Sequence, residues 1–75
     1  DLSGANLSHA DLSNADLSGA NLSHADLSHA NLRHATLMSA NFRNANLNGV
    51  DMGRVDLSNA DLSETDLSRA RVEYA

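Results

Sequence analysis

The sequence predicts an all-β solenoid, in which the chain winds into stacked coils made of short straight edges and tight corners. Three observations lead to this fold class. The 75 residues divide into fifteen consecutive units of five without remainder. The second residue of every unit is apolar, and the fifth is alanine in twelve units. Strict repetition at one short period is typical of folded repeat proteins and not of disordered tracts. We number the residues of each unit as its first to fifth places.

A helix does not fit this period. An α-helix turns about 100° per residue, so residues five apart differ by about 500° and spiral around the axis without forming one apolar face. The backbone must instead return every fifth residue to one interior. The apolar side chains that must all point into this interior are those of the second places, namely Leu2, Leu7, Leu12, Leu17, Leu22, Leu27, Leu32, Leu37, Phe42, Leu47, Met52, Leu57, Leu62, Leu67 and Val72.

Each unit predicts one straight edge and one corner. Residues two apart on an extended chain share a face, so Ala5 and Leu7 point inward while Asn6 points outward. Ser8 and His9 must then turn the chain so that the next Ala-x-Leu faces the same interior. Glycine and asparagine favour such corners because they tolerate positive φ or bond their own backbone. They occupy the fourth place at Gly4, Asn14, Gly19, Asn44, Gly49 and Asn59.

The aspartates indicate how many edges form one coil. Stacked coils of β structure lie about 4.8 Å apart, so two aspartates directly above one another repel. With four units per coil, residues 20 apart stack, and no first-place Asp falls on another Asp. With three units per coil, Asp1 falls on Asp16 and Asp51 on Asp66. The distribution predicts four units per coil, about 3.75 coils, and a rod roughly 18 Å long.

The units, read as Ala-Asp/Asn-Leu-x-x, resemble the pentapeptide-repeat proteins, and the resemblance covers all 75 residues. It implies a right-handed quadrilateral parallel β-helix with four pentapeptides per coil and with the second and fifth places pointing inward. We expect residues 1–75 to form a single domain. The last unit departs from the pattern at Arg71, Val72, Glu73 and Tyr74, where the array either continues or begins a cap.

Composition and charge exclude several functional classes. The chain has no cysteine, so it contains neither disulfides nor cysteine-bound metals. The formal net charge is −5 and no lysine is present, which argues against direct nucleic-acid binding. No apolar run exceeds two residues, so the sequence contains neither a membrane span nor a signal peptide. Because the chain starts at Asp1 with a complete unit, we expect it to be part of a longer protein.

The sequence predicts no catalytic, cofactor-binding or metal site. Serine and aspartate are abundant because they belong to the repeat, and a convex coil supplies neither a pocket nor oxyanion donors. All four histidines occupy fourth places, and the 20-residue stacking puts His9 over His29, with His24 and His34 at other corners. Two exposed imidazoles bind a transition metal only weakly without a carboxylate in place.

Three structural predictions concern the less regular units. The 20-residue stacking puts Arg54 beside Tyr74, within reach of a cation–π contact that would steady the last coil. Met38 occupies a third place and should be exposed. The third coil carries larger inward residues that we expect to fill its core, namely Phe42, Val50, Met52 and Val55.

These observations favour a non-enzymatic structural or protein-interaction module, a rigid repeat scaffold within a larger protein, with a protein partner that the sequence does not identify. The resemblance implies a cyanobacterial source and, for many such arrays, a membrane-attached parent protein, although this piece has the composition of a soluble domain. Uncovered coil ends would expose backbone groups and leucines, so we also expect end-to-end self-association of the isolated chain.

The alternative function is DNA mimicry, because several pentapeptide-repeat proteins bind DNA gyrase as acidic rods in place of duplex DNA. Five net charges over roughly 18 Å is one per about 3.6 Å, whereas duplex DNA carries one per about 1.7 Å. The stretch from Asp26 to Val50 holds one acid against Arg33 and Arg43, so we predict a locally positive middle. Both features count against a topoisomerase target and favour the scaffold hypothesis.

Overall fold

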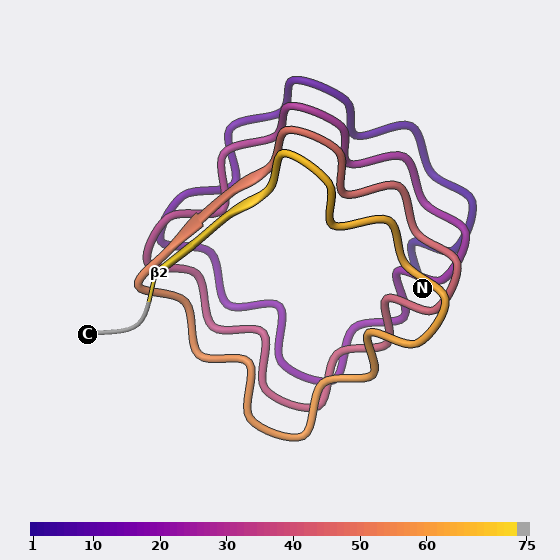
Figure 1. The fold of residues 1–75 in the computed structure, drawn as a ribbon. Coiled ribbons are helices and arrows are strands. Elements are labelled where there is room, and N and C mark those ends of the chain that lie inside the picture. Colours follow the sequence, from indigo (N-terminus) through magenta and orange to yellow (C-terminus); the bar gives the residue numbers. More distant parts are fainter. Residues whose placement is uncertain (74–75) are drawn as a thin grey trace.

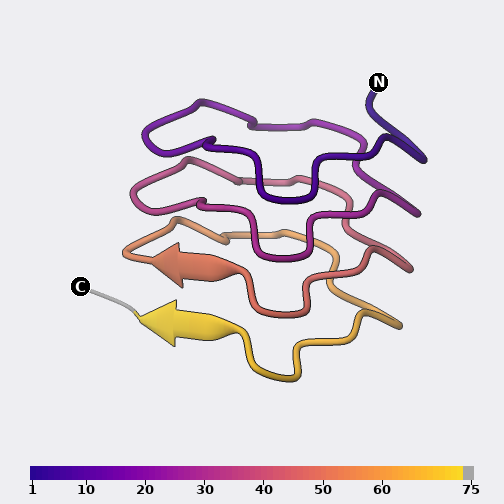
Figure 2. The same ribbon diagram turned by 90° about the horizontal axis from the view of Figure 1, so that it is seen from above.

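The computed structural model describes residues 1–73, which wind into a four-sided coil (Figure 1). Successive turns of the coil lie over one another, and Figure 2 shows them as separate layers. First-place residues 20 apart pair as parallel β-bridges, which confirms the predicted four units per coil. The bridges join Asn6 to Asp26, Asp11 to Asn31, Asp16 to Thr36, Asn21 to Asn41, Asp26 to Asn46, Asn31 to Asp51, Thr36 to Asp56, Asn41 to Asp61 and Asn46 to Asp66.

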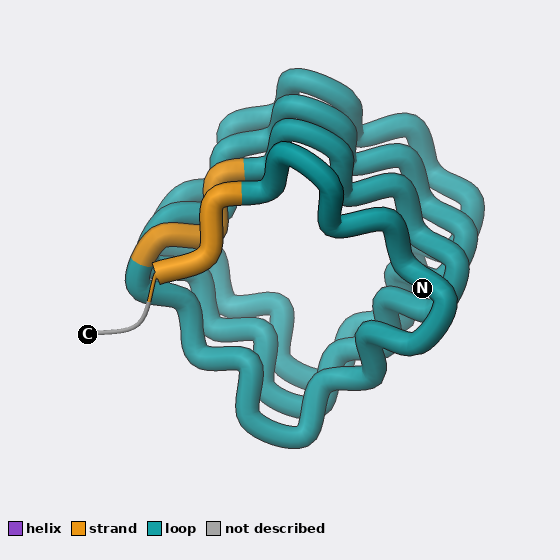
Figure 3. The backbone as a smooth tube through the Cα atoms, viewed as in Figure 1, coloured by secondary structure: helices purple, strands orange, loops and turns teal. Residues whose placement is uncertain are grey.

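Backbone hydrogen bonds join each coil to the next. The N–H of Leu7 donates to the carbonyl of Asp26 at 2.7 Å, and the N–H of Asp26 donates to the carbonyl of Ala5 at 2.9 Å. The same alternation recurs on the other sides, so the sides behave as very short parallel sheets. Most edges contribute a single bridging residue and are drawn as loop (Figure 3). Within the described residues, the regular strands are β1 (Asp51–Gly53) and β2 (Arg71–Glu73), which pair in parallel.

Each corner is a tight turn, commonly closed by one backbone hydrogen bond, as where the N–H of Ala5 donates to the carbonyl of Leu2 at 3.0 Å. The fourth-place residue has positive φ in every unit up to Arg69, between 56° and 72°. Positive φ at the third residue of a four-residue turn is the pattern of a type II β-turn. Glycine adopts it freely, whereas most other residues lose about 1 kcal/mol or more. The non-glycine residues that adopt it are His9, Asn14, His24, His29, His34, Ser39, Asn44, Arg54, Asn59, Glu64 and Arg69.

The core lies inside the coil and is built from second and fifth places, as predicted. The fully buried residues of the middle coils are Leu22, Leu27, Leu32, Leu37, Phe42, Leu47, Val50 and Met52, packed with alanines and Val55. The prediction that the larger residues of the third coil fill its interior is therefore confirmed. No polar or charged side chain is buried among those that the structure describes. In the two outermost coils, Leu2, Leu67 and Val72 are 37%, 40% and 40% exposed, which confirms the predicted exposure of apolar residues there.

The described coils do not form a rod. Their principal extents are 28, 23 and 20 Å, so no direction is much longer than the others. The predicted rod shape is wrong because about four β layers stack to only roughly 18 Å, which does not exceed any of these extents. The molecule presents four sides and four corner columns of nearly equal height.

Candidate functional site

The first-place Asp and Asn side chains hold the corners. In each unit that has Asp or Asn at its first place, up to Asp66, Oδ1 accepts a hydrogen bond from the backbone N–H two residues on, at 2.9–3.1 Å. This contact is an Asx-turn. From the sequence, the first place served only to compare charges between stacked coils, and this contact was not predicted. The signal was present, since Asp or Asn stands two residues before the corner in thirteen of fifteen units.

The serine hydroxyls reinforce the same oxygens. The hydroxyl of Ser28 donates to Oδ1 of Asp26 at 2.7 Å, and seven further serines make the equivalent bond, namely Ser8, Ser13, Ser18, Ser23, Ser58, Ser63 and Ser68. These donors lower the pKa of the aspartates that they contact. The serine hydroxyl is the main cause at Asp11, Asp16, Asp56, Asp61 and Asp66. These surface carboxylates therefore stabilise the turns as well as carrying charge.

The pKa of Asp26 is lowered by the backbone N–H of Ser28 first, then by the Ser28 hydroxyl, and then by the nearby charges of His9 and His29. Asp26 therefore lies within electrostatic reach of both imidazoles. The two rings are stacked, with centroids 5.1 Å apart and planes inclined by 11°. The predicted position of His9 over His29 is confirmed.

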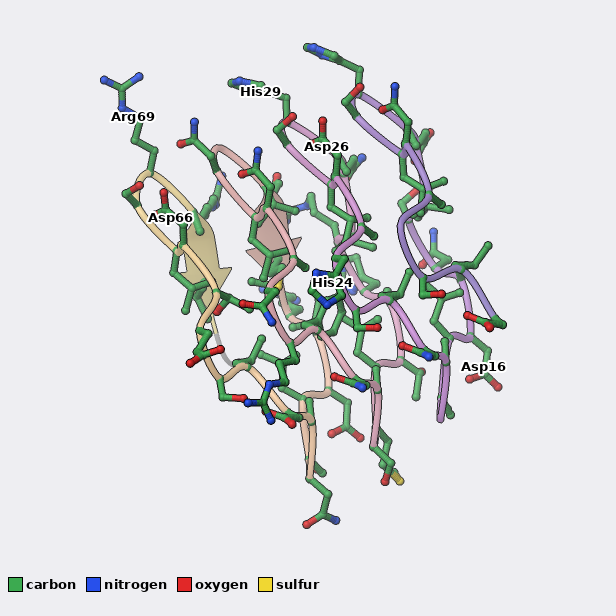
Figure 4. All side chains as sticks on the ribbon, turned by 90° about the vertical axis from the view of Figure 1, so that its right-hand side faces the viewer. Asp16, His24, Asp26, His29, Asp66 and Arg69 are labelled. Carbon is green, nitrogen blue, oxygen red and sulfur yellow. The ribbon has the colours of Figure 1, made fainter. Side chains whose placement is uncertain are left out.

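The other two histidines, His24 and His34, lie at other corners, as the 20-residue stacking predicted. Figure 4 shows His29 and Arg69 extending from one side of the coil, while His24 projects from another. Within residues 1–73, no three His, Cys, Asp or Glu side chains converge on a common metal position. The Arg54–Tyr74 contact stays a prediction, because Tyr74 lies outside the described residues. Met38 is 42% exposed, as its third place predicted.

Arg33 in the second coil and Arg43 in the third each pair with an acid from the following coil. The guanidinium of Arg33 lies 3.6 Å from the carboxylate of Asp51, and that of Arg43 lies 3.9 Å from Glu64. Asp51 and Glu64 both lie beyond the stretch from Asp26 to Val50 that appeared positive in the linear sequence. The prediction of a locally positive middle is therefore wrong, because stacking brings acids from later units beside these arginines.

One further irregularity lies beside Arg33. Gly53 occupies a third place, where serine is usual, and a Cβ added there would stand 2.8 Å from Nη1 of Arg33. The glycine leaves room for the guanidinium to lie against the backbone next to Asp51. The 20-residue stacking makes Gly53 and Arg33 neighbours, but it does not predict that the guanidinium occupies the space a side chain at Gly53 would fill.

No helix within the described residues is long and apolar enough to cross a membrane.

A search of curated protein sequences gave no match. The fold resembles that of several solved structures, however. A pentapeptide-repeat protein of the Arabidopsis thaliana thylakoid lumen aligns with a TM-score of 0.94 and 30% identity over 96% of this chain. One from Nostoc PCC 7120 aligns with a TM-score of 0.75 and 37% identity over 93%.

A third pentapeptide-repeat protein, from the cyanobacterium Cyanothece 51142, aligns with a TM-score of 0.57 and 33% identity over 91% of this chain. The chain covers 50%, 62% and 53% of these three structures in turn, so it spans little more than half of their lengths. The family model of pentapeptide repeats matches residues 1–37 and again residues 37–73. With the 20-residue stacking of its units, these matches show that the chain belongs to the pentapeptide-repeat family and has its quadrilateral β-helix fold.

Proposed function

We propose that the chain is a non-enzymatic protein-binding scaffold whose recognition residues are its fourth places. The observation that carries the proposal is a division of roles within each unit. The second and fifth places fill the core, and the first place accepts the backbone N–H at the corner. Most third-place serines donate to that same first-place oxygen. The fourth place needs only positive φ, so its side chain is free to vary, and it is exposed at every corner up to Arg69 except Gly49.

The fourth places supply chemically varied groups. Imidazoles, amides, arginines, hydroxyls and a carboxylate occur there, whereas the first places carry mainly Asp and Asn. A partner that contacts one corner column therefore meets donors and cations flanked by carboxylates. Such a mixed polar surface suits the rim of a protein–protein interface. Because the related structures are about twice as long, we place this scaffold within a larger protein whose other parts supply further contacts.

The proposal also concerns the cellular compartment in which that larger protein works. One relative comes from the thylakoid lumen of a plant and two come from cyanobacteria. We infer a partner in a cyanobacterial or plastid compartment, with the parent protein either free in that compartment or attached to its membrane. Fractionation of cells with an antibody against this domain distinguishes the two, since an attached parent remains with the membrane after a high-salt wash.

A capture experiment with corner variants tests the scaffold proposal. Four variants each replace the fourth-place side chains of one column by asparagine, which already occupies corners at Asn14, Asn44 and Asn59. Each variant and the unchanged chain are immobilised, exposed to extract of the source organism, and compared by quantitative mass spectrometry. Circular dichroism verifies that the fold is retained. We expect a protein retained by the unchanged chain and lost from one column variant; retention that no column affects contradicts the proposal.

DNA mimicry is tested with the same material. Replacing Asp56, Asp61 and Asp66 by asparagine removes three charges and preserves the Oδ1 acceptors, as the native Asn46 shows. Charge reversal would break those Asx-turns and confuse loss of charge with loss of fold. The scaffold proposal expects no effect of the chain on DNA gyrase supercoiling. Inhibition that the asparagine variant relieves would support mimicry in its place.

A further inference from the structure

The stacked histidines form a pair that the other histidines do not. His9 and His29 belong to one corner column, continued by Gly49 and Arg69 at 20-residue intervals. Their rings are parallel to within 11° at 5.1 Å, and both side chains are exposed. The two imidazoles therefore lie one above the other on the outside of the same corner column.

Gly49 controls how His29 is oriented. A Cβ added at Gly49 would stand 2.6 Å from Nδ1 and 2.8 Å from Cε1 of His29, so the ring occupies the space that a side chain there would fill. Nδ1 of His29 thus faces the next corner, and Nε2 is not among the ring atoms nearest Gly49. The His9 ring lies nearly parallel to it at the same exposed corner.

This spacing suits chelation by two imidazoles. Histidines on adjacent turns of a helix, with Cβ atoms about 5–6 Å apart, bind zinc together in metalloproteases. Coils of β structure stack at about 4.8 Å, which is slightly closer. Metal–nitrogen distances of about 2.0–2.1 Å require the two Nε2 atoms to tilt toward each other, which side-chain rotation at an exposed corner permits.

We propose that His9 and His29 form an open site for a divalent transition ion of the Zn²⁺, Ni²⁺ and Cu²⁺ class. Each imidazole supplies one ligand through Nε2. The remaining coordination positions are filled by water or by side chains of another molecule. These ions prefer imidazole over the carboxylate and carbonyl ligands that suit Mg²⁺ and Ca²⁺.

The charges around the pair favour a cation. Asp26 lies within electrostatic reach of both rings, and Ser28 holds its Oδ1 at 3.0 Å through the backbone N–H. No metal site was predicted from the sequence partly because no carboxylate was expected beside the pair, and Asp26 supplies that charge. Arg69 belongs to the same column but lies farther along the coil from His29 than Asp26 does (Figure 4). By the 20-residue register it is two coils away, with Gly49 between them. Asp26 therefore lies nearer to the histidine pair than Arg69 does.

Titration calorimetry with NiCl2 at neutral pH tests the site, using the chain and four single variants. His9→Asn and His29→Asn each remove one ligand of the pair. His24→Asn and His34→Asn are matched controls, because these residues occupy the same place in their units and have the same positive φ of 61°. Asparagine retains the corner in each case, as at Asn14 and Asn44.

The chelate has a distinct signature. Loss of either His9 or His29 should weaken Ni²⁺ binding about tenfold or more, because the second ligand no longer benefits from its high local concentration. The His9/His29 double variant should bind little more weakly than either single variant, and the two controls should change affinity by less than about twofold. Ni²⁺ should also raise the melting temperature of the unchanged chain but not of His29→Asn, since binding to the folded state stabilises it.

Two results would overturn the proposal. Equal weakening by all four single variants would show independent imidazoles with no chelation. Failure of the unchanged chain to saturate with Ni²⁺ by about 1 mM would show that the pair holds no ion. Either result leaves the scaffold proposal intact, because partner capture by the corner columns is measured separately and without added metal.

Discussion

Leu27 offers the sharpest test of how the coil is stabilised. Its side chain is 0% exposed in the second coil, and the 20-residue stacking places it in one column with Leu7, Leu47 and Leu67. Leu67 has the same place and the same column but is 40% exposed. Replacing each leucine by alanine therefore compares one chemical change at two levels of burial.

The expected magnitudes follow from that difference. Leu27→Ala removes fully buried methyl groups and leaves a cavity between neighbouring coils, which should cost about 2–5 kcal/mol. Leu67→Ala loses only part of the transfer free energy and leaves no closed cavity, so its cost should be about 1 kcal/mol. A 75-residue chain has a total stability of about 4–11 kcal/mol. The first variant should therefore lose a large part of it and the second a small part.

Urea unfolding followed by circular dichroism at 25 °C measures both costs. The wild-type midpoint should fall much further for Leu27→Ala than for Leu67→Ala. Ser28, the neighbour of Leu27, is unsuitable as an outward control because its hydroxyl donates to Asp26. Equal losses for the two leucine variants would refute the inward assignment of the second place and the reasoning that depends on it.

Three further predictions concern the corners. Thr36 occupies a first place without an Asx bond, so Thr36→Asn should raise the stability by roughly 0.5–1 kcal/mol in thermal melts, and Thr36→Asp should gain less because Asp16 and Asp56 flank it. Ser39 has φ of 62°, so Ser39→Val should cost about 1–2 kcal/mol in urea unfolding, with Ser39→Gly as the tolerated control; equal effects would contradict the role of φ. Six aspartates have a lowered pKa in the folded chain. Their stabilisation is present above the unfolded aspartate pKa of about 4 and is lost as pH falls through the lower folded value. Urea midpoints should thus decrease from pH 6 to pH 3, and a constant midpoint would contradict the Asx contribution.

The sequence alone determined the coil. A period of five with an apolar second place and a small fifth place excludes a helix and requires a corner in every unit. The absence of aspartate over aspartate predicted four units per coil, because repulsion between stacked charges acts at a spacing of about 4.8 Å. These conclusions depend only on residue type and spacing, which repetition presents fifteen times in the same chain.

Only the tertiary structure decided what the surface side chains do. The Asp and Asn oxygens turn back to the corners, Arg33 and Arg43 pair with acids of the following coil, and His9 stacks on His29 beside Asp26. Each contact between coils joins residues about 20 apart and depends on side-chain rotamers. Position in the repeat specifies which backbone sites are neighbours, but it does not specify where an exposed side chain points. That direction is set by the hydrogen bonds and charges it meets on the adjacent coil.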